Sequence, residues 1–356
     1  MPENPTSDAS TPATPHKRRV RYRGTHPRRF ADKYKEQNPD RYVADVQKVI
    51  ASGKTPAGTH RPICVREILK ILAPKPGEMA VDCTLGYGGH AREIIPCILP
   101  GGRLLGLDVD PIELPRTEAR LRALGFPPES LLVRRTNYAG LPQALAAENI
   151  AAADMVLADL GVSSMQIDNP ERGFSFKLDG PLDLRMNPQR GQPASALLGN
   201  IDAAALAQIF AENSDEPYAR VIAEHLCRVR STKPIATTKS LAQHVHAALR
   251  PTRRGETEIE LSTRRVFQAL RIAVNDEFNA LETFLRQLLD CLKPGGRVAI
   301  LTFHSGEDRR VKKSFQSSEQ SGAYARIARE VIRPTSEEVR ANPRASSAKL
   351  RWAIRA

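Results

Sequence analysis

The sequence predicts a Rossmann-like α/β fold, a doubly wound parallel sheet interrupted by an inserted helical domain. Short apolar runs alternate with helical segments between about residues 60 and 160. This alternation is typical of a parallel sheet with helical crossovers. It stops for about 100 residues and returns as a final buried run at 297–303. The simplest account is one sheet domain split by a helical insertion.

The first half of the sheet domain can be assigned element by element. A helix is expected over 65–72, since Ile68, Leu69 and Leu72 share one face, and the segment 74–77 ends it. Further helices are expected at 90–99 and 112–124. Strands are expected at 79–83, 103–108, 131–134 and 155–158.

The second half begins with a change of pattern. From Met165 to about Ser262 there is no clear strand signal. Helices are expected there at 202–212, 217–230 and 238–249. A single long helix is then predicted over 264–290, followed by the strand 297–303 and a last strand, 350–354, closing the sheet edge. The expected domains are 57–164 with 263–356 for the sheet and 165–262 for the insert.

Residues 1–56 form a basic extension that we expect to be disordered. Positions 1–15 are rich in Pro, Ser and Thr, and 38–52 has a helical, amphipathic pattern. Residues 16–36 carry nine Lys or Arg with interleaved aromatic residues. Such an arm can place charge on phosphates and rings on bases; the alternative is a solvated tail.

Composition narrows the class of protein. The 356-residue chain is 41% hydrophobic, and its net charge of +13 favours a polyanion, above all nucleic acid, as partner. No apolar run approaches the roughly 20 residues that span a bilayer, and the first twenty residues lack an apolar core. Five scattered cysteines without C-x-x-C spacing fit a reducing compartment. We therefore expect a cytoplasmic protein without a membrane partner.

The segment Val81–His90 is the strongest local signal for a ligand. It joins an apolar run to a glycine-rich turn, and a second run ends at Asp108, 22 positions after Gly86. Strand, glycine turn, helix, strand and acid is how an α/β sheet holds a nucleoside, with the acid on the ribose hydroxyls. Gly86, Gly88 and Ala91 also fit a dinucleotide motif. By itself the turn permits a nicotinamide dinucleotide, S-adenosylmethionine, or no ligand.

Three acids end three of the expected strands, namely Asp82, Asp108 and Asp159. The carboxyl ends of parallel strands line one crevice. Asp108 is placed for a ribose, and Asp159 lies at the switch point where a reacting group would sit. The alternative for Asp159 is a capping role for the turn that follows it.

Several separated blocks resemble the bacterial small-subunit ribosomal RNA cytosine-N4 methyltransferase family, the methyltransferase H family. They occur in the family's order over about 60–356. The blocks are His60-Arg61-Pro62, Gly88-Gly89-His90, Asp159-Leu160-Gly161-Val162-Ser163-Ser164, Glu171-Arg172-Gly173-Phe174-Ser175-Phe176, Asp179 to Met186, Arg265 to Ile272, Phe303-His304-Ser305 and Asn342-Pro343-Arg344-Ala345.

The resemblance implies an S-adenosylmethionine-dependent class I methyltransferase whose helical insert recognises RNA. It implies methylation of a 16S rRNA cytidine near the ribosomal P site, within the small ribosomal subunit. Tyr138 departs from the Phe of many relatives, a change that preserves stacking on adenine. The residues that the resemblance assigns to the cofactor are Gly88, Gly89, His90, Asp108, Tyr138, Asp159 and Gln166. It implies no metal, and a homodimer is one form it allows.

The chemistry of cytosine N4 agrees with a catalytic Asp159. The N4 lone pair is delocalised into the ring, and a carboxylate that accepts an amino N–H helps to localise it for in-line attack on the methyl group. Positioning and electrostatics then supply most of the rate. Methylation at C5 would instead need a cysteine nucleophile beside the base. Cys83 lies in the glycine turn without an evident base, so we reject that mechanism.

Contacts to the substrate are predicted in the loop after Asp159 and at the end of the last buried strand. Phe174 or Phe176 would stack on an unstacked base, and hydrophobic anchoring of the insert is the alternative. His304 would contact base or phosphate, or be a structural histidine. Several arginines could reach phosphate, although a solvated or salt-bridged state is the favoured interpretation for each one alone: Arg185, Arg253, Arg254, Arg264, Arg265 and Arg271.

Two other functions stay open at this point. A dehydrogenase would explain the glycine turn and Asp108, but not the turn after Asp159 or the long insert. A non-catalytic RNA-binding or assembly factor could keep the same fold. Measuring which cofactor binds distinguishes a dehydrogenase from a methyltransferase. Measuring methyl transfer to small ribosomal subunits distinguishes a non-catalytic factor from a methyltransferase.

Overall fold

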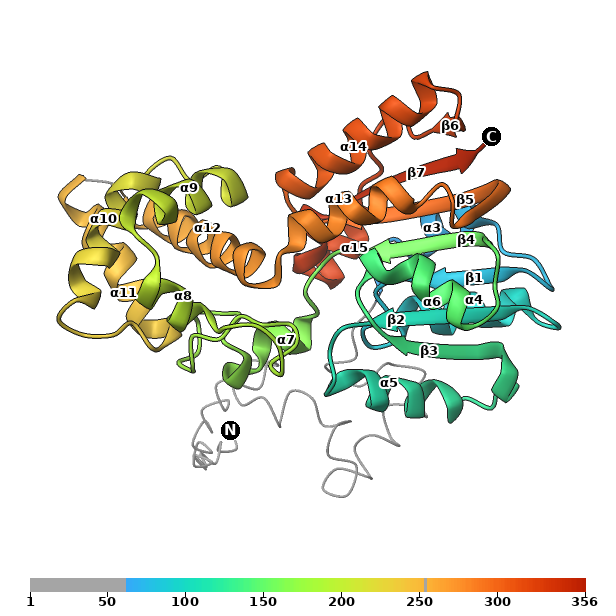
Figure 1. The fold of residues 1–356 in the computed structure, drawn as a ribbon, viewed down its shortest axis with the longest axis horizontal. Helices are drawn as coiled ribbons and strands as arrows, with labels where there is room; N and C mark the ends of the chain where they lie inside the picture. Colours follow the sequence, from blue (N-terminus) through green and yellow to red (C-terminus); the bar gives the residue numbers. More distant parts are fainter. Residues whose placement is uncertain (1–61, 253–254) are drawn as a thin grey trace, which may run out of the picture. The chain divides into compact units, whose positions relative to one another are not determined.

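The computed structural model describes residues 62–252 and 255–356 (Figure 1). Its centre is a seven-stranded sheet in the order β3-β2-β1-β4-β5-β7-β6. The strands are β1 (Met79–Asp82), β2 (Arg103–Asp108), β3 (Leu131–Arg135), β4 (Ala153–Asp159), β5 (Leu292–Thr302), β6 (Tyr324–Ile327) and β7 (Lys349–Arg355). The first five are parallel, and β7 runs antiparallel between β5 and β6. This confirms the predicted α/β fold.

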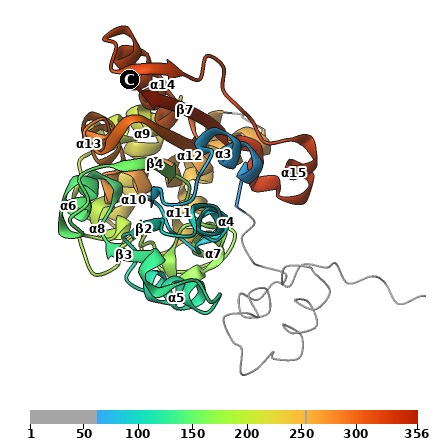
Figure 2. The ribbon, with the colours of Figure 1, turned by 90° about the vertical axis from the view of Figure 1, so that its right-hand side faces the viewer.

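Helices cover both faces of the sheet, and alternate residues of each strand feed the two cores (Figure 2). In β4, Val156 and Ala158 belong to one core, while Met155 and Leu157 belong to the other. One face is covered by α6 (Leu141–Ala147), α13 (Glu277–Gln287) and α14 (Ser305–Gln320). The other is covered by α3 (Val65–Leu72), α4 (Gly89–Ile98) and α5 (Glu113–Arg122).

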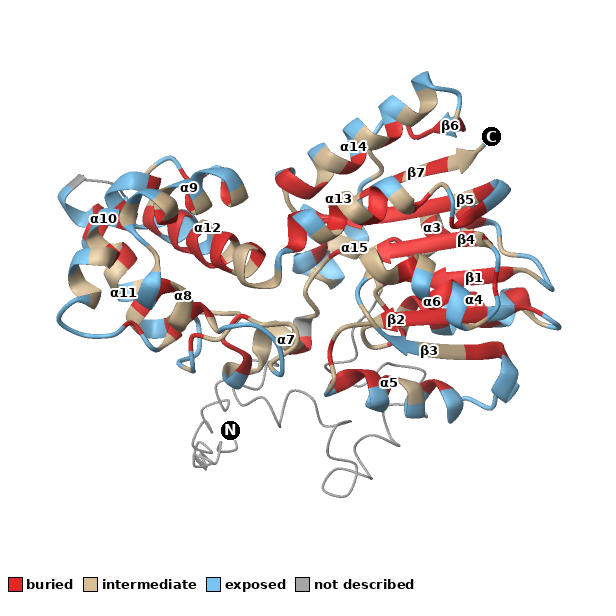
Figure 3. Cartoon of the chain, viewed as in Figure 1, coloured by how far each residue is buried: buried red, intermediate tan, exposed pale blue. Residues whose placement is uncertain are grey.

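The helical region lies between β4 and β5 in the chain and has its own hydrophobic core. Figure 3 shows buried residues on the inward sides of these helices. It contains α7 (Ser164–Asp168), α8 (Ala194–Asn200), α9 (Ala203–Ser214), α10 (Ala219–Arg230), α11 (Thr238–Leu249) and α12 (Glu256–Asn275). Because α12 contributes residues as far as Leu270 to this core, the packing continues beyond the predicted end of the insert at 262.

Two expectations about secondary structure were wrong. The single helix predicted over 264–290 is two helices, because Asp276 adopts a left-handed conformation (φ 52°) between α12 and α13. Asp tolerates this conformation better than most residues, and the apolar pattern continues on both sides of the break. The strand at 350–354 does not close the sheet, since β6 pairs outside β7.

Several further elements were not predicted, namely α6, α7, α8, α14, α15 (Ser336–Ala341) and β6. Their sequences are short or, in α14, strongly polar, so no clear apolar pattern indicates a helix or strand there. The basic arm, the expected helix at 38–52 and His60 lie outside the described residues. None of the helices formed by residues 62–252 and 255–356 combines the length and apolar character required to span a bilayer.

Candidate active site

The sheet order creates a switch point between β1 and β4. From β1 the chain continues outward through β2 and β3, then returns to place β4 on the other side of β1. Ligands of open α/β sheets bind beyond the carboxyl ends of the strands at such a point. Asp82, Asp108 and Asp159 end β1, β2 and β4, so the predicted acids lie on three adjacent strands of this edge.

Asp82 forms the buried base of this edge. Its side chain is only 1% exposed, and one of its oxygens accepts a hydrogen bond from the Thr84 amide at 3.1 Å. Burial raises the pKa of Asp82 to about 6; His90 opposes the rise, while Asp159 and Asp108 add to it. His90, Asp159 and Asp108 therefore lie close enough to Asp82 to affect its carboxyl group.

The glycine turn is held in a conformation that favours glycine at two positions. Gly86 and Gly88 have φ values of 49° and 75°. A Cβ on Gly88 would lie 3.0 Å from Leu121, so α5 packs tightly against the turn. The Gly86 carbonyl accepts a hydrogen bond from the buried Thr117 hydroxyl at 2.5 Å. This brace from α5 fixes the turn at the end of β1.

Asp108 is oriented by the same turn. Its two carboxylate oxygens accept backbone hydrogen bonds from Gly86 at 2.8 Å and from Asp110 at 2.9 Å. Burial raises the pKa of Asp108, although these backbone donors oppose the rise. Each carboxylate oxygen can accept a second hydrogen bond. Asp108 is therefore prepared to accept from a pair of hydroxyl groups.

Asp159 and His90 lie close together at this edge of the sheet. Oδ2 of Asp159 lies 3.9 Å from Nδ1 of His90, and their side chains are 15% and 7% exposed. The other ring nitrogen, Nε2, lies 3.0 Å from the Ile63 carbonyl oxygen. The Asp159 amide donates to the Thr84 hydroxyl at 2.6 Å, which ties β4 to the turn after β1. Its carboxylate has only a long 3.4 Å contact with the Gly161 amide, so it is not a strong cap.

Gln166 has both ends of its side-chain amide occupied by protein. Its oxygen accepts from the Ser163 amide at 3.0 Å, which completes a capping box at the start of α7. Its nitrogen donates to Asp110 at 3.0 Å. Gln166 therefore shapes the loop after β4, and a contact between its side chain and the cofactor stays a prediction.

Sequence reasoning missed the buried ion pair between Asp110 and Arg172. The two side chains are 1% and 8% exposed, and the guanidinium donates to the carboxylate at 2.7 Å. Arg172 also donates to the carbonyl oxygens of Met186 and Arg185. This pair joins the loop after β2 to the start of the helical region. The only available signal was an acid two positions after Asp108, which many α/β turns share.

Tyr138 lies in the short turn after β3, as expected for a residue beside an adenine. Its ring packs against Phe284 with centroids 5.5 Å apart, and its hydroxyl lies 3.4 Å from the Glu277 carbonyl. Burial raises the pKa of Tyr138, so the phenol stays neutral. The ring is therefore the part of the side chain that could contact a ligand. Stacking on adenine stays a prediction.

The predicted base-stacking residues lie against the core of the helical region. Phe176 packs on Phe267 with centroids 5.4 Å apart, and the Arg172 guanidinium lies 5.7 Å from the ring centre of Phe174. Both rings are partly buried there, an arrangement that also fits the anchoring role weighed as the alternative. A base could stack only on the exposed part of either ring.

The predicted polar contacts are also engaged within the protein. Arg185 forms a two-pronged pair with Asp183 at 2.8 and 2.7 Å. His304 begins α14, with Nε2 3.1 Å from Glu307, whose other carboxylate oxygen accepts from the Phe303 amide. Burial alone would raise the pKa of Glu307, but His304 and Arg271 outweigh it and lower the pKa.

Arg271 is not free to reach phosphate. Its guanidinium makes two 2.8 Å hydrogen bonds to Glu277 across the break between α12 and α13. Arg264 pairs with Glu260 on the surface, Arg265 lies 3.9 Å from the buried Glu216, and positions 253 and 254 lie outside the described residues. Of the roles weighed for Arg271, the salt bridge is the one that these contacts bear out.

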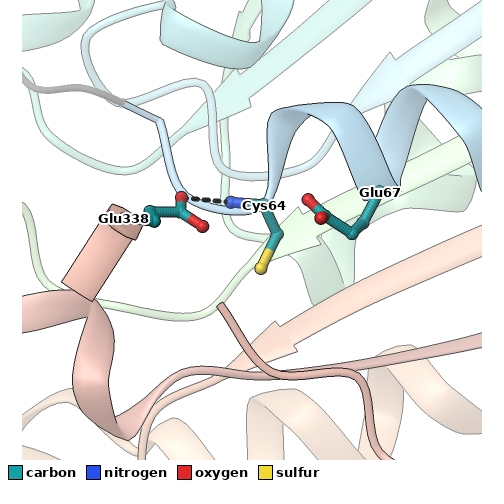
Figure 4. Close-up of side chains that lie close together, drawn as sticks. All are labelled: Cys64, Glu67 and Glu338. Carbon is teal, nitrogen blue, oxygen red and sulfur yellow. Dashed lines mark hydrogen bonds between the residues drawn. The ribbon is translucent and has the colours of Figure 1, made fainter. Parts of the chain in front are cut away.

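Cys64 lies between Glu67 and Glu338 at the start of α3 (Figure 4). Glu338, from α15, accepts a hydrogen bond from the Cys64 amide at 2.8 Å and so caps α3 from a distant part of the chain. Burial, aided by the surrounding carboxylates, raises the pKa of the Cys64 thiol to about 12. Such a thiol is a poor nucleophile and a poor metal ligand near neutral pH.

Comparisons with known proteins identify the family. A family model described as "MraW methylase family" matches residues 57–356. A protein of Lachnoclostridium phytofermentans named "Ribosomal RNA small subunit methyltransferase H 1" is 50% identical over 96% of this chain and 93% of its own. A protein of Alkaliphilus metalliredigens named "Ribosomal RNA small subunit methyltransferase H 2" is 52% identical over 95% of this chain and 97% of its own.

Proposed function

Because the chain belongs to the MraW methylase family, we propose that it transfers a methyl group from S-adenosylmethionine to N4 of a cytidine. The substrate is small-subunit 16S ribosomal RNA, in the region of the P site and presented within the small ribosomal subunit. The names of the relatives support the RNA class. The observation that supports the chemistry is the position of Asp159, a partly exposed carboxylate at the switch point of the sheet.

The residues around the crevice suit this cofactor chemically. The cofactor carries a sulfonium, an ammonium and a ribose diol, and the crevice offers carboxylates at the ends of β1, β2 and β4. Asp108 would hold the ribose hydroxyls, and Tyr138 would flank the adenine. Gly88 and Gly89 would let the backbone approach closely, with His90 and Gln166 beside the methionine part. When bound, the cofactor supplies an electrophilic methyl group.

Asp159 would act on the amino group of the base. Its carboxylate accepts an N4–H, which turns the nitrogen lone pair out of conjugation and toward the methyl carbon. Because the carboxylate is only 15% exposed, water competes weakly for this hydrogen bond. As the N–C bond forms, the S–C electron pair stays on sulfur, and the nitrogen releases a proton to the carboxylate.

The buried, neutral thiol of Cys83 in the glycine turn argues against methylation at C5 of the base. Cys83 is buried, and burial raises its pKa well above the ordinary thiol value, with Asp82 adding to the rise. A thiol held neutral cannot add to C6 of a pyrimidine. Direct transfer to an exocyclic amine needs no such nucleophile.

The test is a single-turnover assay on unmodified small ribosomal subunits with a labelled methyl donor. Asp159→Asn keeps the size of the side chain but removes the basic oxygen, and we expect the rate constant to fall by about 10²- to 10⁴-fold. Asp154→Asn is the matched control, because Asp154 lies at the opposite end of β4 and is 18% exposed. That variant should react at the wild-type rate.

Two results would contradict the proposal. An Asp159→Asn variant as fast as the control would remove the role of the carboxylate. A wild-type protein that binds the subunit but transfers no methyl group would favour a non-catalytic assembly factor. A homodimeric state and a cytoplasmic location stay predictions.

A further inference from the structure

One ring nitrogen of His90 is held by a hydrogen bond to the backbone, and the proposed function assigns no role to the other. Its Nε2 lies 3.0 Å from the Ile63 carbonyl oxygen, in a side chain that is 7% exposed. A carbonyl oxygen only accepts hydrogen bonds, so Nε2 must carry the hydrogen. In a neutral imidazole the other nitrogen, Nδ1, then carries a lone pair.

That lone pair faces a second acceptor. Nδ1 lies 3.9 Å from Oδ2 of Asp159, which is itself an acceptor when ionised. Two acceptors that face each other without a hydrogen between them gain nothing from their proximity. One added proton converts them into a carboxylate and an imidazolium, which attract each other. The arrangement therefore has a place for one proton.

The proposed reaction releases one proton at this point. When N4 bonds to the methyl carbon and the S–C pair stays on sulfur, the nitrogen becomes cationic and loses a hydrogen to Asp159. We propose that this proton passes from Asp159 to Nδ1 of His90, which leaves the carboxylate ionised. This inference rests on the proposed methyl transfer and adds a proton acceptor to it.

The transfer from Asp159 to His90 requires a small movement. The 3.9 Å separation must close by about 1 Å to reach the length of a charge-assisted hydrogen bond. The product is an imidazolium held between the Ile63 carbonyl and Asp159. His90 thus acts through Asp159 and positions it in its ionised form for the next turnover.

Other titratable groups face this pair and must be separated from it. Asp82, on β1, interacts electrostatically with His90 and Asp159, and burial raises its pKa to about 6. Cys64, beside Ile63, interacts with Asp159, but burial raises its pKa to about 12, so it stays neutral over the useful range. Asp82 is therefore the group that a control must remove.

The test is the pH dependence of the single-turnover rate constant between pH 5.5 and 8.5, with cofactor and small subunits saturating. The wild-type rate constant should fall toward acid pH, about tenfold per pH unit at the low end, because a protonated imidazole cannot accept. His90→Gln keeps an amide near Nε2 that can donate to Ile63 and removes Nδ1. We expect it to lose the acidic limb and to react about 10- to 100-fold more slowly.

Two companion variants sharpen the result. His90→Asn places an amide oxygen near Nδ1 and should also lose the acidic limb, because an amide does not take up a proton in this range. Asp82→Asn should keep the limb, which assigns it to His90. His90→Gln should still bind S-adenosylhomocysteine, as measured by calorimetry, so that the rate constant at saturating cofactor reports on the proton step.

The outcomes separate the two proposals. A product other than N4-methylcytidine would refute the proposed function itself. N4-methylcytidine formed by the wild type at a rate independent of pH over this range would refute the role of His90 alone, even if no variant folds. So would an acidic limb that persists in His90→Gln, or a weakened S-adenosylhomocysteine affinity with an unchanged saturated rate.

Discussion

Replacing Arg172 by Met would leave the Asp110 carboxylate without its cationic partner. Asp110 is 1% exposed, and the guanidinium that would be lost also donates to two backbone carbonyls. Removing one partner of a buried pair costs about 3–5 kcal/mol of unfolding free energy, because an uncompensated charge remains buried. Met preserves the apolar part of the side chain, so the loss reports on charge and hydrogen bonding.

A double-mutant cycle with Asp110→Asn isolates the interaction between the two side chains. The asparagine can still accept from the amides of Ile112 and Glu113, which Asp110 caps at the start of α5. Since the double variant buries no unpaired charge, it should lose less stability than the two single variants added together. We expect a coupling energy of about 2 kcal/mol or more.

Urea unfolding followed by circular dichroism measures these differences, with an unchanged m-value showing that the exposed surface is the same. Arg220→Met is the control, because Arg220 forms a pair with Glu224 on the surface of α10. Its unfolding midpoint should not move measurably. If Arg172→Met and Asp110→Asn were additive within about 0.5 kcal/mol, the buried pair would not join the two regions as described.

Two remaining predictions concern Asp82 and the N-terminal arm. Since burial raises the pKa of Asp82 to about 6 from 3.8, the folded state holds its proton where the unfolded state has lost it, and stability falls as pH rises from about 4 to 6. Asp82→Asn should remove this pH-dependent loss of unfolding free energy, which is about 3 kcal/mol. The stability of the variant relative to wild type should therefore rise between pH 4 and pH 7. A difference in unfolding free energy that stays constant with pH would contradict this prediction. Deleting residues 1–55 removes the basic arm and should weaken binding to ribosomal RNA and flatten its salt dependence, whereas an unchanged affinity across a salt series would show that the arm does not contribute.

The strands that form the site could be predicted because their sequence carries the information locally. A run such as Met155–Ala158 is apolar on both faces, as a central parallel strand requires, and an acid at its end marks the crevice. Glycine turns can be recognised in a sequence because glycine is the residue that most readily adopts positive φ. The α/β fold and the position of Asp159 followed from such signals.

Features that depend on distant pairs could not be predicted in this way. Arg172 and Asp110 are 62 positions apart, and neither residue type indicates which charge it will meet. For the same reason, the sequence could not indicate that Arg271 pairs with Glu277 beyond the helix break. The break between α12 and α13 lies at Asp276, which adopts a left-handed conformation. The sequence does not indicate this break, because the apolar pattern of α12 continues into α13.

The position of β6 outside β7 illustrates a further limit. The strand β6 has only four residues, two of them exposed, so its apolar pattern is too short to be distinguished from a loop. Its pairing with β7 is decided by the antiparallel register in the folded chain. Sheet order at an edge therefore needs the structure.

The central claim is that Asp159 serves methyl transfer to the exocyclic amine of a cytidine in small-subunit ribosomal RNA. The most direct measurement is mass spectrometry of nucleosides and oligonucleotides from unmodified small subunits treated with the protein and S-adenosylmethionine. The account predicts one N4-methylcytidine in 16S RNA with wild type and with Asp154→Asn, and almost none with Asp159→Asn. A methyl group on C5, on another base or on the ribose, or equal yields from all three proteins, would contradict it.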